Sequence, residues 1–120
     1  MKLKTLIIGV SRNPYRYANR AVKALEQNGY ECVGLGRHSF YIEGFKVHSE
    51  LPLSILVDTV TLYINPKLQE HYKKFIIKLN PRRVIFNPGT ENPVFEQMLS
   101  NKGIKTSNAC TLVLLATNQY

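Results

Sequence analysis

Short apolar runs rich in β-branched residues recur along the chain, and Gly, Pro, Asn or charged residues bound each of them. The runs cover residues 5–8, 31–35, 59–64 and 83–86, with a weaker run at 104–106. They are mostly continuous rather than alternating, which is typical of strands that are covered on both faces. The pattern therefore predicts five buried strands.

Segments with the period of an amphipathic helix lie between these runs, at residues 16–28, 67–79 and 93–102. Gly29 and Gly103 stand where a helix often ends in a left-handed residue. The face expected to enter the core consists of Ala18, Ala21, Val22 and Leu25 in the first segment, Leu68, Tyr72, Phe75, Ile76 and Leu79 in the second, and Val94, Phe95, Met98 and Leu99 in the third. We expect three helices at these positions and a short last helix after residue 110.

Strands that alternate with helices of this length predict right-handed βαβ units. The expected fold is a doubly wound, mostly parallel sheet of five strands in a three-layer α/β/α arrangement. Residues 38–58 interrupt the alternation and contain a short strand-like piece near 45–47. No internal repeat or low-complexity run divides the chain, so residues 1–120 are expected to form a single domain.

Composition narrows the classes of protein. The 120 residues include 44% hydrophobic residues, and 16 Lys and Arg against 8 Asp and Glu give a net charge of +8, which favours an anionic partner. Asp58 is the only aspartate, which makes a hydrolase or metal site built on clustered aspartates hard to assemble. The two cysteines lack a C-x-x-C motif and do not make a zinc site on their own. The apolar runs are far shorter than the ~18 residues of a membrane helix. The first ten residues are basic and then apolar, but the apolar run is too short and no cleavage site follows, so they do not match a signal peptide. We therefore expect a cytoplasmic protein with no membrane partner.

Candidate ligand-binding residues follow the predicted strands. Ligands of open parallel sheets bind beyond the carboxyl ends of the strands. Gly, Ser, Asn, Thr and Arg gather at those ends, in residues 9–17, 36–38, 65–67, 87–93 and 107–111. The opposite edge carries mainly Lys, Asn-Pro and Asn-Gly. The sequence therefore places the site at the carboxyl edge.

The first of these loops has the pattern G-x-S-x-x-P. Gly9 allows a tight turn and a close approach to a ligand, Ser11 and Asn13 offer hydrogen bonds and helix caps, and Pro14 suits a first helical turn. Free amides at such a helix start favour a phosphate or pyrophosphate. A purely structural strand-to-helix turn is an equally open interpretation.

The second loop begins with Gly36 and Arg37, and no acidic residue lies between Glu31 and Glu43. NAD-binding folds usually place an acid about 20 residues beyond the glycine loop, where it holds the ribose hydroxyls. An arginine there suits a phosphorylated ribose instead, as in coenzyme A or NADP. The alternative is an ordinary solvated arginine.

Other chemistry-bearing residues are scattered. A basic stripe of Arg12, Arg16, Arg20 and Lys23 at helical spacing is compatible with nucleic acid, but a solvated helix face explains it better because no base-stacking motif accompanies it. Cys110, at the start of the last helix, is either a reactive thiol or a packing residue. No acid–base pair or triad can be assembled, so the sequence favours a binding protein over an enzyme.

The loops resemble, in order and spacing, the small single-domain CoA-binding protein family, which is similar to the CoA-binding domain of succinyl-CoA synthetase α subunits. The matching segments are Gly9-x-Ser11-x-x-Pro14-x-Arg16, Gly36-Arg37, Tyr63-Ile64-Asn65-Pro66, Asn87-Pro88-Gly89-Thr90-Glu91-Asn92-Pro93 and residues 109–115. The resemblance covers nearly the whole chain, and the Asn-Pro-Gly-Thr-Glu-Asn-Pro loop is its most specific part. It implies a Rossmann-type fold.

The resemblance also implies contacts with coenzyme A. Gly9, Ser11, Arg12, Asn13 and Pro14 would hold the pyrophosphate, with Arg16 beside them, and Arg37 would meet the adenosine end. Tyr63, Asn65 and Pro66 would line the groove beside adenine and ribose, whereas Asn87, Pro88, Gly89 and Thr90 would face the pantetheine. Many relatives have Asn-Pro where this chain has Gly36-Arg37, so the adenosine contacts differ here.

The function expected from the sequence is binding of coenzyme A or acyl-CoA, in a carrier, sensor or thiol-protecting role. The ligase activity of the larger synthetases is not expected, because their phosphorylatable histidine lies in another domain. An NADP-dependent oxidoreductase-like protein is the alternative, although no Tyr-x-x-x-Lys motif accompanies it. A basic nucleic-acid-interaction module is a third reading, and a homo-oligomer is left open.

Overall fold

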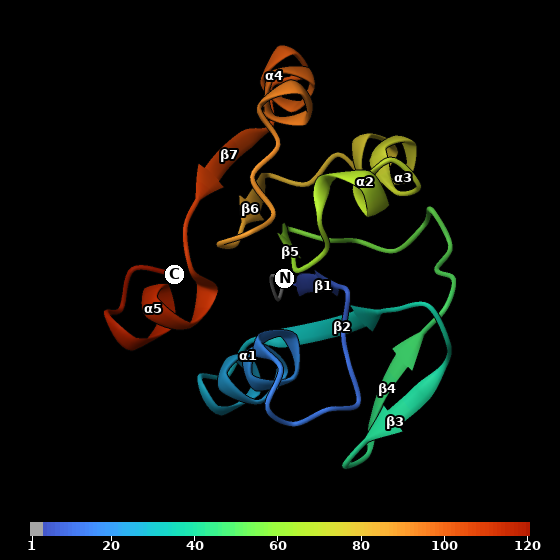
Figure 1. Cartoon of the computed structure of the whole chain (residues 1–120), viewed down its shortest axis with the longest axis vertical. Coiled ribbons are helices and arrows are strands. Elements are labelled where there is room, and N and C mark those ends of the chain that lie inside the picture. The colour runs from blue at the N-terminus through green and yellow to red at the C-terminus, as the bar shows by residue number, and fades with distance from the viewer. Residues whose placement is uncertain (1–3) are drawn as a thin grey trace.

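The computed structural model describes residues 4–120 and has a seven-stranded sheet at its centre (Figure 1). The strands are β1 (Lys4–Ile8), β2 (Glu31–Leu35), β3 (Phe40–Ile42), β4 (Phe45–His48), β5 (Thr59–Leu62), β6 (Arg83–Phe86) and β7 (Lys105–Asn108). The helices are α1 (Tyr17–Gln27), α2 (Pro66–Gln69), α3 (Lys73–Leu79), α4 (Pro93–Asn101) and α5 (Thr111–Ala116). No helix within residues 4–120 is both long and apolar enough to cross a membrane.

The sheet has the order β3-β4-β2-β1-β5-β6-β7, and only the β3–β4 pair is antiparallel. Without β3, the six parallel strands follow the order 3-2-1-4-5-6 that is typical of Rossmann folds. The predicted doubly wound, mostly parallel sheet is therefore confirmed, and it extends two strands beyond the expected five. Its topological switch point lies between β1 and β5.

The two additional strands form a hairpin at one edge of the sheet. Glu43 and Gly44 connect them with φ values of 46° and 86°, as in the two-residue turns that join short hairpins. β4 covers the strand-like piece expected near residues 45–47. β3 was not expected, because a strand of three residues is too short to show an alternating pattern.

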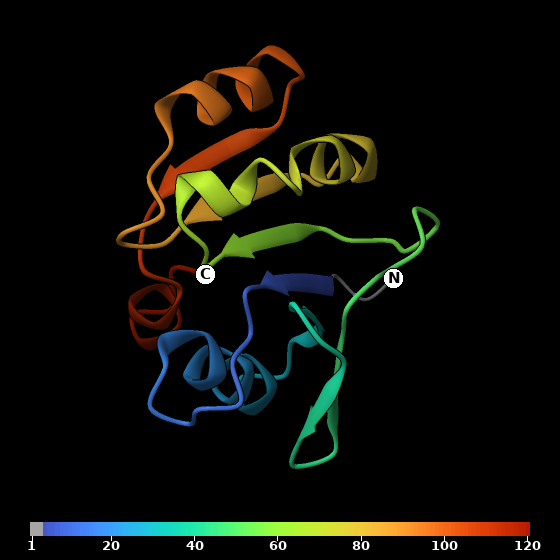
Figure 2. The same cartoon turned by 45° about the vertical axis from the view of Figure 1, so that its right-hand side comes forward.

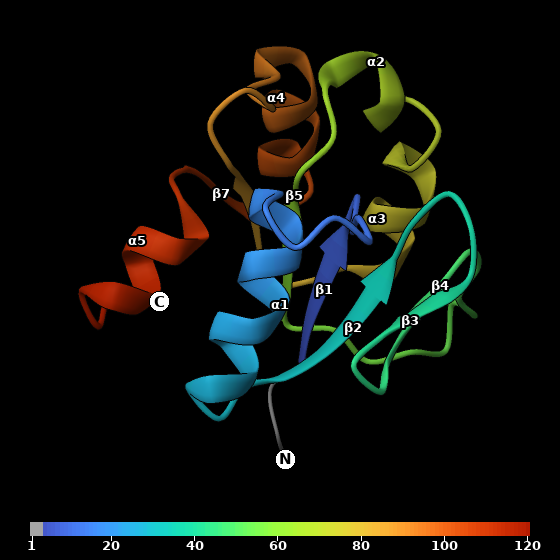
Figure 3. The same ribbon diagram turned by 60° about the horizontal axis from the view of Figure 1, so that its bottom comes forward.

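Helices cover both faces of the sheet. Along β1, Leu6 and Ile8 point to one face and Ile7 to the other, as successive strand residues must. The first face packs against α3 and α4, and the second against α1 and α5, which lie side by side (Figures 1 and 3). The buried side chains from these helices include Ile76, Phe95 and Leu99 on the first face, and Val22, Leu25 and Leu115 on the second.

Two predicted helix faces need correction. The segment 67–79 forms two helices, α2 and α3, with a break at residues 70–72. Leu68, expected in the core, is 51% exposed, while its neighbour Gln69 is fully buried. On α4, Phe95 and Leu99 are buried as expected, but Val94 and Met98 are exposed.

Candidate functional site

The parallel strands all end at the same edge of the sheet (Figure 2). The loops that follow them surround a groove of about 520 Å³. The groove crosses the ends of β1, β2, β5 and β6 and therefore lies at the topological switch point. It is lined by Gly9, Val10, Arg16, Gly36, Arg37, Tyr63, Ile64, Asn65, Leu68, Tyr72, Pro88, Gly89 and Thr90.

The groove brings together many of the residues that the sequence selected, from four separate loops. These are Gly9, Arg16, Arg37, Tyr63, Asn65, Pro88, Gly89 and Thr90. Ser11, Arg12, Asn13, Pro14 and Pro66 lie outside its lining, and Asn87 lines a second cavity instead. The sequence did not select Leu68 or Tyr72, because their helical spacing resembled that of a core face.

Gly9 permits the close contact between the first loop and the end of β5. Its φ is +99°, and a Cβ at this position would lie 2.7 Å from Cγ2 of Ile64 and 3.2 Å from the carbonyl of Tyr63. Its amide donates to the carbonyl of Leu35 at 2.9 Å. Only glycine combines this backbone angle with so little space.

The loop between β1 and α1 is stabilised by its own side chains. The Oγ of Ser11 accepts from the Asn13 amide at 3.1 Å, and Oδ1 of Asn13 accepts from the Tyr15 amide at 2.9 Å. The helix begins only at Tyr17, so the prediction that Ser11 and Asn13 cap it and that Pro14 lies in its first turn is wrong. Arg16 is the N-cap residue and provides no side-chain acceptor.

A buried asparagine attaches this loop to α1. Asn19 is 1% exposed, and its Nδ2 donates to the carbonyl of Ser11 at 2.9 Å. The guanidinium of Arg12 lies 4.9 Å from the ring centroid of Phe40 on β3, which places Arg12 against the hairpin rather than in the groove lining. The start of α1 has no side-chain cap, and a helix start leaves backbone amides without partners inside the helix.

The charge of the groove is positive. Arg16 and Arg37 both line it and are exposed, and neither forms an ion pair with another residue of the range 4–120. No acidic residue is among its lining residues in that range. Two arginines without carboxylate partners, next to an uncapped helix start, favour an anionic ligand.

The buried amide of Gln69 connects two loops of the groove. Its Nε2 donates to the carbonyls of Ile64 at 2.8 Å and Thr90 at 2.7 Å, and its Oε1 accepts from Nδ2 of Asn92 at 2.9 Å. The loops after β5 and β6 are therefore held at a fixed separation. Sequence reasoning missed Gln69, since a glutamine in a helical segment gives no sign of burial.

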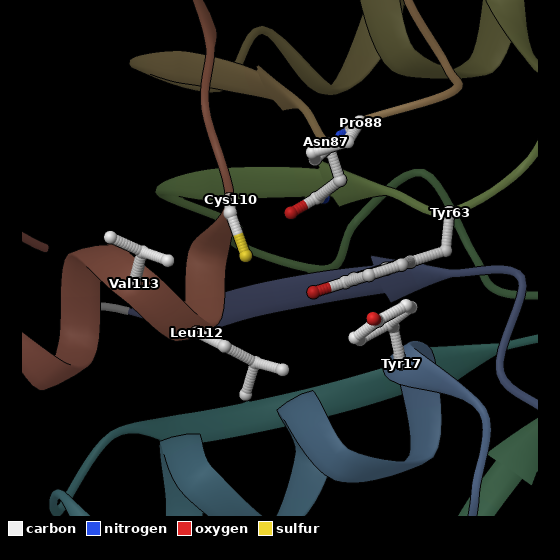
Figure 4. A pocket seen from close by; sticks show the side chains of 7 residues that line it. All are labelled: Tyr17, Tyr63, Asn87, Pro88, Cys110, Leu112 and Val113. Carbon is white, nitrogen blue, oxygen red and sulfur yellow. The ribbon is translucent and has the colours of Figure 1, made fainter.

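A second cavity, of about 360 Å³, lies beside the groove (Figure 4). Its lining is mainly apolar and consists of Tyr17, Tyr63, Asn87, Pro88, Cys110, Leu112 and Val113. Tyr63 and Pro88 line both cavities, so the two adjoin at these residues. The residues from α1 and α5 in this lining were not among the predicted site residues.

Asn87 holds this region together. Its Nδ2 donates to Oγ1 of Thr61 at 2.6 Å and to the carbonyl of Leu62 at 2.9 Å, while its Oδ1 accepts from the amide of Thr111 at 2.8 Å. Asn87 thereby joins the ends of β5 and β6 to the start of α5. Because its amide group is engaged in these bonds, its role is to position the cavity wall.

The hydroxyl of Tyr63 is the unpaired polar group of this cavity. It is buried and no partner meets hydrogen-bond geometry among residues 4–120, although the hydroxyls of Thr61 and Thr111, which bond to each other at 2.8 Å, lie nearby. Burial raises the pKa of Tyr63 to about 12, so the hydroxyl is a proton donor at neutral pH. Figure 4 shows this hydroxyl and the sulfur of Cys110 pointing toward the same space.

The comparison with protein families decides the relationship. A family model described as a CoA binding domain matches residues 4–116. The chain belongs to this CoA-binding domain family. No curated protein matches the chain.

Solved structures with the same fold extend this CoA-binding domain comparison. A crystal structure of an uncharacterized protein has 43% identity and a TM-score of 0.94, over 100% of this chain and 99% of that one. A hypothetical protein from Pyrococcus horikoshii OT3 has 26% identity and a TM-score of 0.83, over 93% and 80% of the two chains. The dinucleotide-forming acetyl-coenzyme A synthetase 1 of Candidatus Korarchaeum cryptofilum has 11% identity and a TM-score of 0.72, over 88% and 25%, and shows a similarity of fold alone.

Proposed function

We propose that this protein binds coenzyme A or an acyl-CoA in the groove at the carboxyl edge, in a carrier, sensor or thiol-protecting role. The observation that carries the proposal is the pair of unpaired arginines, Arg16 and Arg37, in a groove at the switch point of a CoA-binding domain. Coenzyme A is elongated and carries its negative charge at the nucleotide end. A groove with arginines toward β1 and β2 suits such a molecule.

Each part of the ligand has a proposed place. The pyrophosphate lies at the loop after Gly9 and the uncapped start of α1, next to Arg16, because these supply amides and positive charge. The adenosine 3′-phosphate lies at Arg37, and the pantetheine continues past Gly89 toward β6. Ser11, Asn13 and Asn19 contribute indirectly by shaping the loop.

Binding of NADP is the second candidate function, because Arg37 would pair equally well with a ribose 2′-phosphate. The test is therefore a thermal-shift and calorimetry series with CoA, dephospho-CoA, NADP and NAD. We expect CoA to raise the Tm most, since a ligand that binds only the folded state stabilises it. No shift at millimolar CoA contradicts the proposal, and a larger shift with NADP favours the second candidate.

The same series tests the position of the 3′-phosphate. Arg37→Gln should weaken CoA binding by about 10-fold, because a hydrogen bond between charged groups contributes about 1.5–3 kcal/mol. Dephospho-CoA should lose much less affinity. The matched control is Lys105→Gln, which removes one exposed positive charge at the start of β7, on the opposite edge. Equal losses for both ligands would place Arg37 away from the 3′-phosphate.

A further inference from the structure

We propose that the second cavity is an acyl-binding site, which receives the aliphatic acyl group of an acyl-CoA whose nucleotide lies in the groove. This inference rests on the proposed function and names its ligand more closely. It predicts that acyl-CoA thioesters, rather than free CoA, are the preferred ligands. The cavity lies between the start of α1 and the start of α5 (Figure 4).

The chemistry of the lining favours an aliphatic chain. Leu112 and Val113 from α5 and the ring of Tyr17 from α1 line this cavity, and little of the lining surface is polar. Tyr17 is 63% exposed and Val113 is 56% exposed, so apolar surface is left open to water here. A volume of about 360 Å³ lies within the usual range of small-molecule sites, ~300–1,000 Å³.

The order of the two cavities sets which end of the ligand reaches this site. Arg37 stands at the β2 end of the groove, whereas Pro88 stands at the β6 end and also lines the second cavity. A ligand with its terminal phosphate at Arg37 therefore directs its opposite end toward Pro88 and the second cavity. In an acyl-CoA, that opposite end is the thioester and its acyl chain.

Tyr63 lines both cavities, and its hydroxyl points toward Cys110 in the second one (Figure 4). A buried donor without an acceptor destabilises the site relative to a paired one, and no partner meets hydrogen-bond geometry with this hydroxyl among residues 4–120. The carbonyl oxygen of a thioester is an acceptor that the free thiol of CoA lacks. Tyr63 is thus placed to distinguish an acyl-CoA from CoA itself.

The test is calorimetric titration of the full chain with CoA, acetyl-CoA, butyryl-CoA and hexanoyl-CoA. Each methylene buried should increase affinity up to about 4-fold, so butyryl-CoA should bind about 10-fold more tightly than acetyl-CoA. Leu112→Asn and Val113→Asn should flatten this dependence on chain length. The matched control Leu56→Asn, at an exposed leucine that lines neither cavity, should preserve it.

Tyr63→Phe provides an independent readout, because it removes the hydroxyl and keeps the ring. It should lower the affinity for acetyl-CoA more than the affinity for CoA. Val113 is exposed, so Val113→Asn keeps the test valid if Leu112→Asn fails to fold, as circular dichroism would show.

The outcomes separate the two proposals. Binding of CoA with no dependence on acyl length overturns the acyl site and leaves the proposed function standing. A dependence on length that persists in folded Leu112→Asn and Val113→Asn variants also overturns it, since the chain then lies elsewhere. No binding of any CoA species overturns both proposals.

Discussion

The two edges of the sheet use the same types of residue for different purposes. At the amino edge, Asp58 and Arg82 form an ion pair, in which the carboxylate of Asp58 accepts from Nε of Arg82 at 2.9 Å and from Nη2 at 3.0 Å. At the carboxyl edge, Arg16 and Arg37 have no carboxylate partner within residues 4–120. A net charge of +8 does not reveal this division. The difference that matters is between an arginine held by a carboxylate, as Arg82 is, and the two groove arginines, which have none.

Aromatic contacts add to the closure of the amino edge. The hydroxyl of Tyr120 bonds to Oγ1 of Thr5 at 2.6 Å, and the guanidinium of Arg83 lies 4.4 Å from the centroid of the Tyr120 ring. Burial raises the pKa of Tyr120, in part against the lowering effect of these partners. The carboxyl edge instead has loops that are held apart, with space between them.

The largest loss of stability and of CoA affinity should come from Gly9→Ala, which disrupts the close contact between the first loop and the end of β5 at the carboxyl edge. The added Cβ combines an unfavourable φ with a clash against Ile64 and the backbone of Tyr63, so the free energy of unfolding should fall by about 3 kcal/mol. Binding of CoA should weaken by more than 10-fold. Urea denaturation and calorimetry measure the two quantities.

The control for Gly9→Ala is Gly44→Ala in the hairpin turn. Its φ is +86°, but nothing lies within 4 Å of the added Cβ. The free energy of unfolding of Gly44→Ala should fall by only about 1 kcal/mol, and its affinity for CoA should be unchanged. Equal effects at the two glycines would show that the contact with β5 is unimportant.

For Gln69→Leu, we expect the free energy of unfolding to fall by about 2 kcal/mol, because the buried carbonyls of Ile64 and Thr90 lose their donor. Affinity for CoA should fall together with stability, because both loops line the groove. Gln97→Leu, at an exposed glutamine on α4 that donates only to Asn101 of the same helix, is the control; it should leave CoA affinity unchanged and lower stability by no more than about 0.5 kcal/mol. Loss of stability without loss of affinity would separate Gln69 from the groove.

The smallest loss of stability should come from Asp58→Asn, which removes the charge that pairs with Arg82 at the amino edge. We expect a loss of about 1 kcal/mol at pH 7 and unchanged CoA binding. The hydrogen bond from Arg82 lowers the pKa of Asp58 in the folded state. Its stabilisation is therefore present above the unfolded pKa of about 4 and is lost as the pH falls through the lower folded pKa.

The measurement is the Tm of Asp58→Asn and of the unmodified chain at pH 7 and below pH 4. The difference in Tm should shrink at the lower pH. Glu26→Gln serves as the control, because Glu26 has no ion pair within residues 4–120. A weaker affinity for CoA in Asp58→Asn would show that the two edges are not independent.

The sequence predicts the parallel strands and the edge that holds the groove, because buried parallel strands are continuous apolar runs and their carboxyl ends meet. It does not predict the break between α2 and α3. Gln69 is buried there by hydrogen bonds to Ile64 and Thr90, which come from loops far apart in the chain. The hydrophobic period of a single segment therefore does not predict these hydrogen bonds.

The apolar cavity could not be predicted for a related reason. Leu112 and Val113 belong to an apolar stretch that reads as a buried helix face. In the structure, Leu115 of the same helix enters the core, whereas Leu112 and Val113 line the cavity. Hydrophobic pattern identifies surface that avoids water, but it does not say whether protein or a ligand covers it.

The β3–β4 hairpin has a consequence for self-association through the sheet. An open sheet exposes unpaired backbone groups along its outer strands, and these can recruit further strands into aggregates. Here the outermost strand on one side, β3, has only three residues, and the strand on the other side, β7, begins with the exposed Lys105. Short edges and a charge at the margin give an incoming strand little to pair with. The hairpin thus replaces the longer edge that β2 would otherwise present on this side with a strand of only three residues.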